Sequence, residues 1–200
     1  MEIKNYSDIY KIKPNKLKPL PGNILVANPI IEETYFNRSV ICLIENDDKN
    51  GAMGLVLNKP MPFTLNSVFD KFNKLPDIPV YCGGPIGNDR LLYLHNLGGM
   101  IADSLYISDG ISVGGDILSL ISYISAGNKV DGYIKFFLGY SGWNSEQLQM
   151  EIKTQSWGVG TSCKKDLLTA DGEPFWRRSV ENLGEGYSPW LKFPYSPMLN

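Results

Sequence analysis

The fold of this chain is constrained most by a series of short apolar runs, each closed by turn-forming residues. The runs have the length of β-strands and lie at 24–28, 39–44, 52–58, 78–81, 90–95, 104–107, 111–113, 133–138 and 156–159. Two connections, Asp47–Gly51 and Ser108–Gly110, consist of turn residues, so each is expected to join its flanking runs as an antiparallel hairpin. Gly54, inside the third run, predicts a bulge or the close approach of another backbone.

Four further segments have apolar residues at helical spacing together with helix-start signals. They are expected at 65–72 after Thr64, at 117–124 after Asp116, at 146–153 after Ser145 and at 173–183, where Pro174 lies in the first turn. The tail from Gly186 is expected to be irregular. Short strands interrupted by helices predict an α+β domain with a mainly antiparallel sheet and about four flanking helices.

The first 21 residues differ from the remainder of the chain. They are polar and lysine-rich and contain three prolines, so residues 1–21 are predicted to form an arm, with a short helical turn at 7–12. Residues 22–200 contain no low-complexity segment and no linker that would divide them. We therefore expect a single domain at 22–200.

Charge and cysteine content narrow the class of protein. The formal net charge is −2 and the pI is near 5.5, whereas a general nucleic-acid binder is usually more basic. The three cysteines lack the paired spacing of a zinc ribbon or a redox motif, which favours reduced thiols. No apolar run approaches the roughly 18 residues of a membrane span, and the first residues lack a signal-peptide core. These features predict a cytoplasmic protein that does not enter a membrane.

The segment Val80–His95 gathers the densest group of backbone-special and ionisable residues. It contains Cys82, a Gly-Gly-Pro corner at 83–85, the pair Asp89 and Arg90, and the only histidine of the chain. This corner is therefore the place where a site is first sought.

Five motifs, in this order, resemble those of the YqgE/AlgH family of bacterial proteins, which are often labelled transcriptional regulators. They are Leu-Val-Ala-Asn-Pro at 25–29, Phe-Asn-Arg-Ser-Val at 36–40, Gly-Ala-Met-Gly-Leu-Val-Leu-Asn-Lys-Pro at 51–60, Val-Tyr-Cys-Gly-Gly-Pro at 80–85 with Asp89-Arg90 and Leu94-His95, and Gly-Tyr-Ser-Gly-Trp at 139–143 with Gln147-Leu148. The resemblance runs from about Gly22 to Gly184. It implies a compact α+β fold on a coiled, partly barrel-like sheet, and no established enzymatic activity, cofactor or catalytic residue.

The chain departs from this family pattern at three places. Glu45-Asn46 replaces a common Glu-His, Lys59 replaces the arginine of Asn-Arg-Pro, and Asn144-Ser145-Glu146 replaces a Gly-Pro-Gly. A role that depended on a histidine at position 46 is therefore not expected here.

A pocket for an anionic ligand is the most specific site hypothesis. The backbone N–H groups of Gly83 and Gly84 are arranged to form a nest, and Arg38, Arg90 and His95 supply positive charge if the fold brings them together. Asp89 lies beside Arg90 and completes the set of candidate residues. The alternative is structural, because glycines also serve tight corners and Asp89 can pair with either arginine.

Other chemistries have weaker support in the sequence. A hydrolase would need Ser39 or Ser141 beside His95, but the elbow motif of serine hydrolases is absent. One histidine without a nearby carboxylate pattern predicts no metal site. Cys82 is a candidate redox-sensitive thiol, although a small buried side chain is the simpler interpretation.

Direct DNA binding is also disfavoured. No helix pair has a recognition helix rich in Arg, Asn or Gln, and Arg177 and Arg178 are expected on the solvent face of their helix. We therefore expect a non-catalytic binding or regulatory protein without a cofactor, acting through a protein partner and existing as a monomer or weak homo-oligomer. The alternative is a protein or enzyme that binds an anionic metabolite at Gly83–His95 with Arg38.

Overall fold

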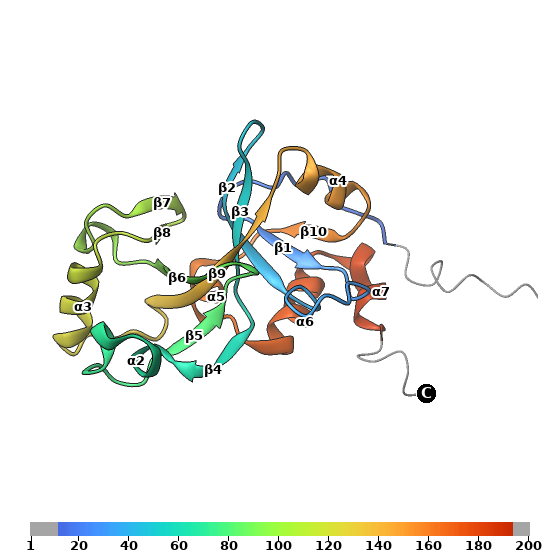
Figure 1. The fold of residues 1–200 in the computed structure, drawn as a ribbon. Helices are drawn as coiled ribbons and strands as arrows, with labels where there is room; N and C mark the ends of the chain where they lie inside the picture. The colour runs from blue at the N-terminus through green and yellow to red at the C-terminus, as the bar shows by residue number, and fades with distance from the viewer. Residues whose placement is uncertain (1–11, 194–200) are drawn as a thin grey trace, which may run out of the picture.

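Ten strands form one open, mainly antiparallel sheet in residues 12–193, the part of the chain that the computed structural model describes (Figure 1). The strands are β1 (Ile24–Ala27), β2 (Val40–Asp47), β3 (Gly51–Val56), β4 (Pro60–Thr64), β5 (Pro79–Cys82), β6 (Ile86–His95), β7 (Leu105–Ser108), β8 (Ile111–Val113), β9 (Ile134–Trp143) and β10 (Trp157–Gly160). Their order is β10-β1-β2-β3-β9-β6-β8-β7, and β4 and β5 branch off beside β9.

Strand β9 joins the two halves of this sheet. Its last residues, Ser141–Trp143, pair antiparallel with β3, while its first half pairs antiparallel with β6 and parallel with β5. Because β9 has a neighbour on each side and is covered on both faces, residues 134–137 are all buried rather than alternately exposed. The side chains of β9 are therefore all buried or half-buried.

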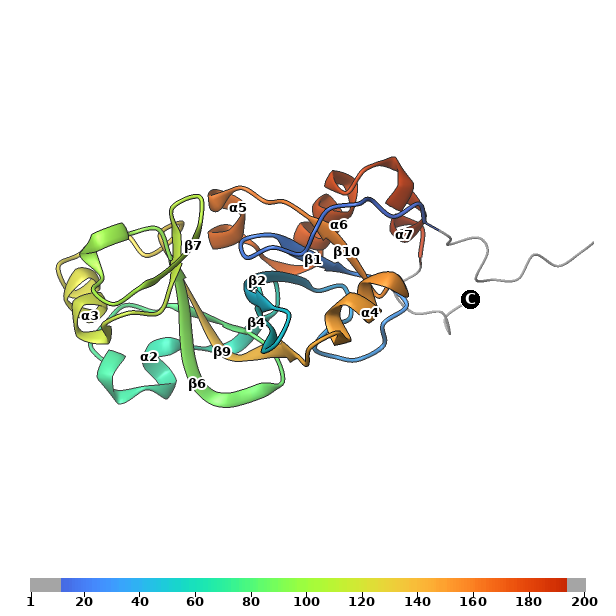
Figure 2. The same ribbon diagram turned by 90° about the horizontal axis from the view of Figure 1, so that it is seen from above.

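Helices flank both halves of the sheet (Figures 1 and 2). They are α2 (Leu65–Val68), α3 (Ile117–Ser125), α4 (Gln147–Lys153), α5 (Lys164–Thr169), α6 (Gly172–Asn182) and α7 (Ser188–Leu191), with 3-10 turns at 70–72, 98–100 and 185–187. Helices α6 and α7 lie near β1 and β10, whereas α2 and α3 lie at the opposite end of the molecule. The helices therefore bury different parts of one long sheet.

The core consists of three clusters that follow this division. The largest includes Trp176 and Trp190 from α6 and α7, packed with strand residues such as Leu55, and a second joins Leu120 of α3 to Phe136 of β9. A third lies under α4. Burying a large apolar side chain contributes about 1.5–3 kcal/mol, so these clusters hold the two halves in place.

The predicted fold class and most local signals are confirmed. The fold is α+β with a mainly antiparallel sheet, and the hairpins β2–β3 and β7–β8 form where turn residues predicted them. Asp116 caps α3 by accepting bonds from the backbone N–H groups of Leu118 and Ser119. Gly54 lies opposite a bulge in β2, and a Cβ atom there would come within 2.9 Å of the Cys42 carbonyl oxygen.

Three local predictions are wrong, and two elements were not predicted. The helix expected at 65–72 ends at Val68 because Phe69 is extended, and a 3-10 turn follows. The N-cap of α4 is Glu146 rather than Ser145. The two elements without a prediction are strand β4 and helix α5. Strand β4 contains two prolines, which are unusual within a sheet, and it pairs only with β5. The tail contains α7, which buries Trp190.

The predicted arm is described only from residue 12. Ile12 is buried, the Lys13 N–H donates to the Gly186 carbonyl at 3.1 Å, and the Asn15 amide donates to the Val159 carbonyl at 2.8 Å. Residues 12–15 therefore pack along the body of the domain. The helical turn expected at 7–12 lies almost entirely outside the described residues.

Candidate functional site

The Gly83–Gly84 corner is occupied by the neighbouring strand β9. The Gly83 N–H donates to the Leu138 carbonyl at 2.8 Å, and the Gly83 carbonyl accepts from the Val56 N–H at 2.9 Å. Gly84 has φ of 151°, and a Cβ atom there would lie 2.3 Å from the Tyr140 backbone. These glycines allow two backbones to approach closely, and the Gly83 N–H is already engaged.

His95 is fully buried at the opposite end of β6. Its Nε2 lies 3.1 Å from the Gly114 carbonyl oxygen, and its Nδ1 accepts a bond from the Leu97 N–H at 3.3 Å. Burial lowers the pKa of the imidazole, an effect that the Gly114 bond partly offsets. The histidine is therefore neutral near pH 7, with Nε2 as the donor.

The spacing along the strands separates the other residues of the predicted site. Arg90 and Asp89 lie on an exposed part of β6, and Arg90 is five residues from His95, or about 16 Å along a strand. His95 pairs with Ile134 on β9, and Ser141 is seven residues further along that strand, or about 23 Å away. Ser141 and His95 are thus too far apart to react together.

Arg38 lies in a separate cluster beside the first turn of α6. Its guanidinium is buried, forms an ion pair with Glu173, donates to the Phe193 carbonyl at 2.9 Å and lies 5.0 Å from the centre of the Trp176 ring. A pocket of about 160 Å³ lies beside it, lined also by Asn58 and Lys59. Arg38 thus has a carboxylate, a carbonyl and an aromatic face as partners.

Asn58 connects this cluster to the sheet. Its Oδ1 accepts from the Val40 N–H at 2.8 Å, and its Nδ2 donates to the carbonyls of Arg38 at 3.0 Å and Gly172 at 2.9 Å. The side chain is 1% exposed. These bonds hold the Asn58–Pro60 segment against the Phe36–Val40 segment and the start of α6.

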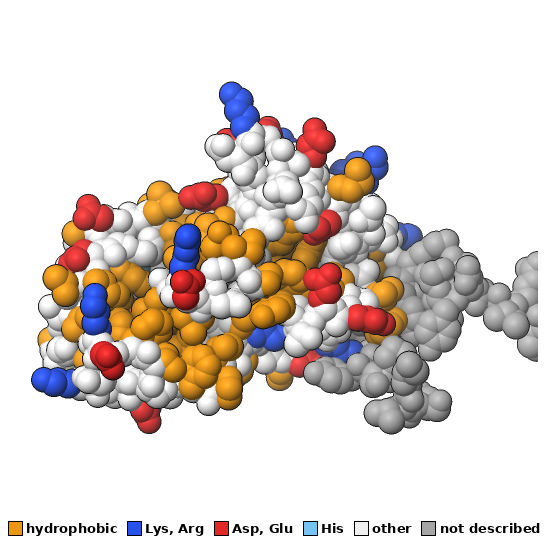
Figure 3. Space-filling model, viewed as in Figure 1, with side chains coloured by type: hydrophobic (Ala, Val, Ile, Leu, Met, Phe, Trp, Pro, Cys, Tyr) orange, Lys and Arg blue, Asp and Glu red, His pale blue; other side chains and the backbone are white. Residues whose placement is uncertain are grey.

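An open groove of about 600 Å³ separates the β2–β3 hairpin from β7. Its apolar wall includes Leu105 and Tyr106, which are 51% and 65% exposed. Glu45 and Asp47 supply carboxylates, and none of the described residues that line the groove is a lysine or arginine. Figure 3 shows hydrophobic side chains gathered on this face between the hairpin and β7.

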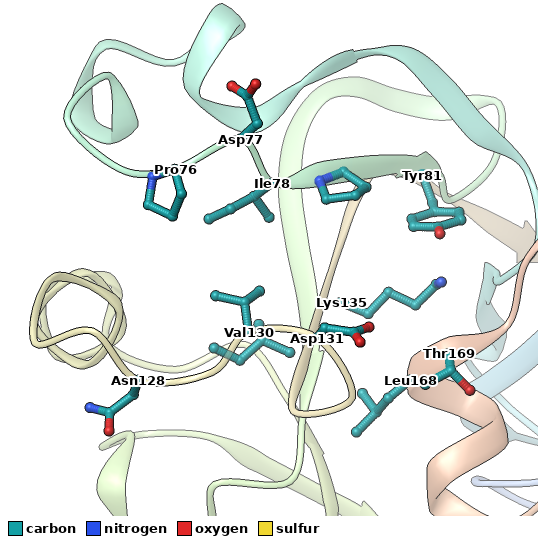
Figure 4. Close-up of a pocket in the computed structure, with 12 residues that line it drawn as sticks. Pro76, Asp77, Ile78, Tyr81, Asn128, Val130, Asp131, Lys135, Leu168 and Thr169 are labelled. Atoms are coloured by element: carbon teal, nitrogen blue, oxygen red, sulfur yellow. The ribbon is translucent and has the colours of Figure 1, made fainter.

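A more enclosed cavity of about 360 Å³ lies at the N-terminal end of β9 (Figure 4). Ile78 and Val130 lie toward one end, with Asp77 and Asn128 at its margin, and the other end holds Tyr81, Asp131, Lys135, Leu168 and Thr169. Lys135 is 3% exposed; its Nζ donates to the Ala170 carbonyl at 2.6 Å and lies 3.2 Å from the centre of the Tyr81 ring.

Burial governs the charge state of this cavity. It lowers the pKa of the Lys135 ammonium to about 7, although the carboxylates of Asp171 and Asp131 act in the opposite direction. Burial, reinforced by Asp171, raises the pKa of the Tyr81 hydroxyl to about 12. Near neutral pH the cavity therefore contains a neutral phenol and a lysine that is partly uncharged.

The cysteines and the candidate metal ligands add no further site. Cys82 is half-buried and burial raises its pKa, which disfavours the thiolate. Within residues 12–193, no group of three or more His, Cys, Asp or Glu side chains could hold a metal ion. Over the same residues, no helix has the length and apolar character needed to cross a bilayer.

Sequence reasoning missed both the groove and the lysine cavity. A signal for the cavity exists, because Lys135 stands alone among Ile134, Phe136 and Phe137 in a strand. A lone lysine in such a run usually marks a solvent-facing position, so the pattern by itself points the wrong way. The groove depends on residues more than 50 positions apart.

The chain is similar to known proteins over nearly its whole length. A family model described as AlgH-like matches residues 24–188. A UPF0301 protein of Parabacteroides distasonis is 46% identical over 197 residues, covering 98% of this chain and 99% of that protein. A UPF0301 protein of Bacteroides thetaiotaomicron is 42% identical, covering 97% of this chain and 98% of that one.

Two solved structures are similar to this one. The solution structure of the AlgH protein from Pseudomonas aeruginosa has a TM-score of 0.68 at 25% identity, covering 92% of this chain and 98% of that one. A crystal structure of a Corynebacterium diphtheriae protein has a TM-score of 0.71 at 22% identity, covering 91% and 95%. The second likeness concerns the fold alone.

Proposed function

We propose that this chain, which belongs to the AlgH-like family, is a non-catalytic binding protein that acts through a protein partner. The partner docks in the groove between the β2–β3 hairpin and β7. The observation that carries the proposal is the exposure of Leu105 and Tyr106 beside two carboxylates. Apolar side chains this exposed, in a hollow with a polar rim, are typical of protein interaction sites.

The charge of the groove defines the chemistry of the partner. Glu45 is exposed, and Asp47 accepts bonds from the backbone N–H groups of Lys49 and Asn50, which hold its carboxylate at the hairpin turn. Hydrogen bonds from these N–H groups lower the pKa of Asp47, so it is ionised at neutral pH. A segment with apolar residues flanked by Lys or Arg complements this surface.

A protein partner is favoured over DNA for the same electrostatic reason. The phosphate backbone requires a positive surface, whereas the groove carries only acidic side chains among its described ionisable residues. A regulatory role would then operate through the partner. Free Cys42, Cys82 and Cys163 support cytoplasmic action, which is part of this proposal.

The test is selection of peptides from a random display library with the full chain, followed by affinity measurements on the selected peptides. We expect apolar residues flanked by Lys or Arg, and at least 10-fold weaker binding to the variants Glu45→Lys and Tyr106→Asp. Leu118→Asp is the matched control, because Leu118 is 65% exposed on α3, away from the groove. Peptides that bind Glu45→Lys and Tyr106→Asp as tightly as the wild type would overturn the proposal.

A further inference from the structure

The cavity at Lys135 has the features of a site for covalent chemistry, independent of the groove. Lysine is a nucleophile only when its amine is uncharged, and an ordinary exposed lysine is almost entirely protonated at neutral pH. Lys135 is 3% exposed, and the apolar side chains that line its cavity include Ile78, Val130 and Leu168. Enclosure by apolar side chains is one of the ways in which proteins activate a lysine amine.

The carboxylate of Asp131 lies near Lys135 and can accept a proton from Nζ through water. Figure 4 shows the Lys135 side chain extending beneath Tyr81, with the Asp131 carboxylate beside it. The Ala170 carbonyl and the Tyr81 ring both lie within reach of the N–H bonds of Nζ. Asp131 is exposed as a residue, so a proton that it accepts can pass to water.

The lining also limits the class of ligand. Asp77 and Asp131 line the cavity and Asp171 acts on Lys135 from nearby, so an anionic head group would meet several carboxylates. The apolar part of the lining suits an uncharged hydrocarbon body, and a volume of about 360 Å³ lies within the usual range for small-molecule sites. An aldehyde or ketone combines such a body with an uncharged, electrophilic head.

We propose that Lys135 forms a reversible imine with a small, uncharged aldehyde or ketone bound in this cavity. The Nζ lone pair forms a bond to the carbonyl carbon, and the carbonyl π electrons move to oxygen, which takes up a proton. The nitrogen loses this first proton through water to Asp131, which returns it to the oxygen and leaves a carbinolamine. A second proton passes from the nitrogen to the hydroxyl group by the same route as the C–O bond breaks, so water leaves and the C=N bond forms. The products are one imine and one water, so neither an oxidant nor a reductant is required.

A structural role for Lys135 would leave the lysine in place but unreactive. In that case the amine only ties the Ala170 carbonyl, at the end of α5, to β9. The two roles differ in the reaction rate of the amine, in its pH dependence and in its response to filling the cavity. An experiment that measures labelling at a single residue therefore separates them.

The test uses the full chain, hexanal as the probe and sodium cyanoborohydride, which donates hydride to the imine carbon and traps a stable secondary amine. Peptide mapping by mass spectrometry at pH 7.5 compares Lys135 with the exposed Lys165. We expect labelling of Lys135 to be at least about 10-fold faster, with a rate that rises through pH 7. Equal labelling rates at the two lysines would overturn the proposal.

Two variants that retain Lys135 complete the test. Val130→Trp fills the cavity and is expected to abolish the fast labelling, whereas unchanged labelling would show that the cavity is not the site. Asp131→Asn removes the proton acceptor and should slow labelling by about 10-fold or more. Removing this carboxylate favours the uncharged amine, so a purely electrostatic role predicts faster labelling instead and would overturn the step assigned to Asp131. Circular dichroism confirms the folding of each variant.

Discussion

Arg38 and Lys135 are both buried basic residues beside the segment that joins α5 to α6, yet their surroundings are opposite. Arg38 contacts a carboxylate, a carbonyl and an indole ring, and its neighbour Asn58 satisfies the backbone around it. Lys135 has a carbonyl and a phenol ring, and its side chain lines an open cavity. The difference shows that burial alone does not distinguish a structural cation from a reactive one. The partners do.

The strongest test of this comparison is the removal of the Arg38 guanidinium. Arg38→Ala leaves Glu173 without its buried partner and exposes one face of Trp176, so we expect a loss of about 3–5 kcal/mol in the free energy of unfolding. Urea denaturation followed by tryptophan fluorescence measures the change. A loss below 1 kcal/mol would mean that the cluster does not hold α6 to the sheet.

Asn58 supplies the second test, because its amide connects the Arg38 cluster to β2 and α6. Asn58→Leu keeps the approximate volume but leaves the Val40 N–H and the Gly172 carbonyl without these partners. Each unsatisfied buried group costs about 1–3 kcal/mol, so we expect a loss of about 2–4 kcal/mol in thermal or urea unfolding. The matched surface control is Asn73→Leu, at an exposed position, which is expected to change stability by less than about 0.5 kcal/mol.

The smallest effect is expected at Lys135 and appears as a dependence on pH. The folded protein lowers the pKa of this lysine to about 7 from its ordinary value near 10.5, so the unfolded chain binds more protons between these values. Stability from this group therefore rises with pH above 7, by about 1.5 kcal/mol between pH 7 and 8.5. Below pH 7 both states are protonated and the contribution is flat.

Lys135→Met isolates this contribution. The difference in unfolding free energy between wild type and variant cancels the other titrating groups, such as Cys42, whose pKa burial raises to about 12. We expect the wild type to gain stability relative to Lys135→Met as the pH rises from 7 to 8.5. A flat difference would place the amine in an ordinary, hydrated environment and would remove the contrast with Arg38.

Local signals predicted much of the fold because their physics is local. The Asp109-Gly110 pair needs positive φ, which it adopts at 46° and 76°, and this alone joins β7 to β8. The Asp116 cap likewise depends only on its own helix. Helix 65–72 failed for the opposite reason, since the extended Phe69 follows from tertiary packing that the apolar spacing does not encode.

The predicted site depended on whether distant residues meet. The sequence singled out Arg38, Asp89, Arg90 and His95 as candidate polar residues, but it could not give their separations along β6 or their partners in other elements. Gly83 and Gly84 were recognised as a corner. Only the packing of β9 against that corner explains why glycine is needed there.

Lys135 shows most clearly what each level decides. The sequence by itself predicted a strand at 133–138, within which β9 begins at Ile134, because apolar and aromatic side chains at this length favour extended backbone. It did not determine that this strand is central. Only the pairing of β9 with β3, β5 and β6 leaves no solvent-facing side for position 135. The tertiary structure thereby turned an ordinary strand lysine into a buried amine beside a cavity.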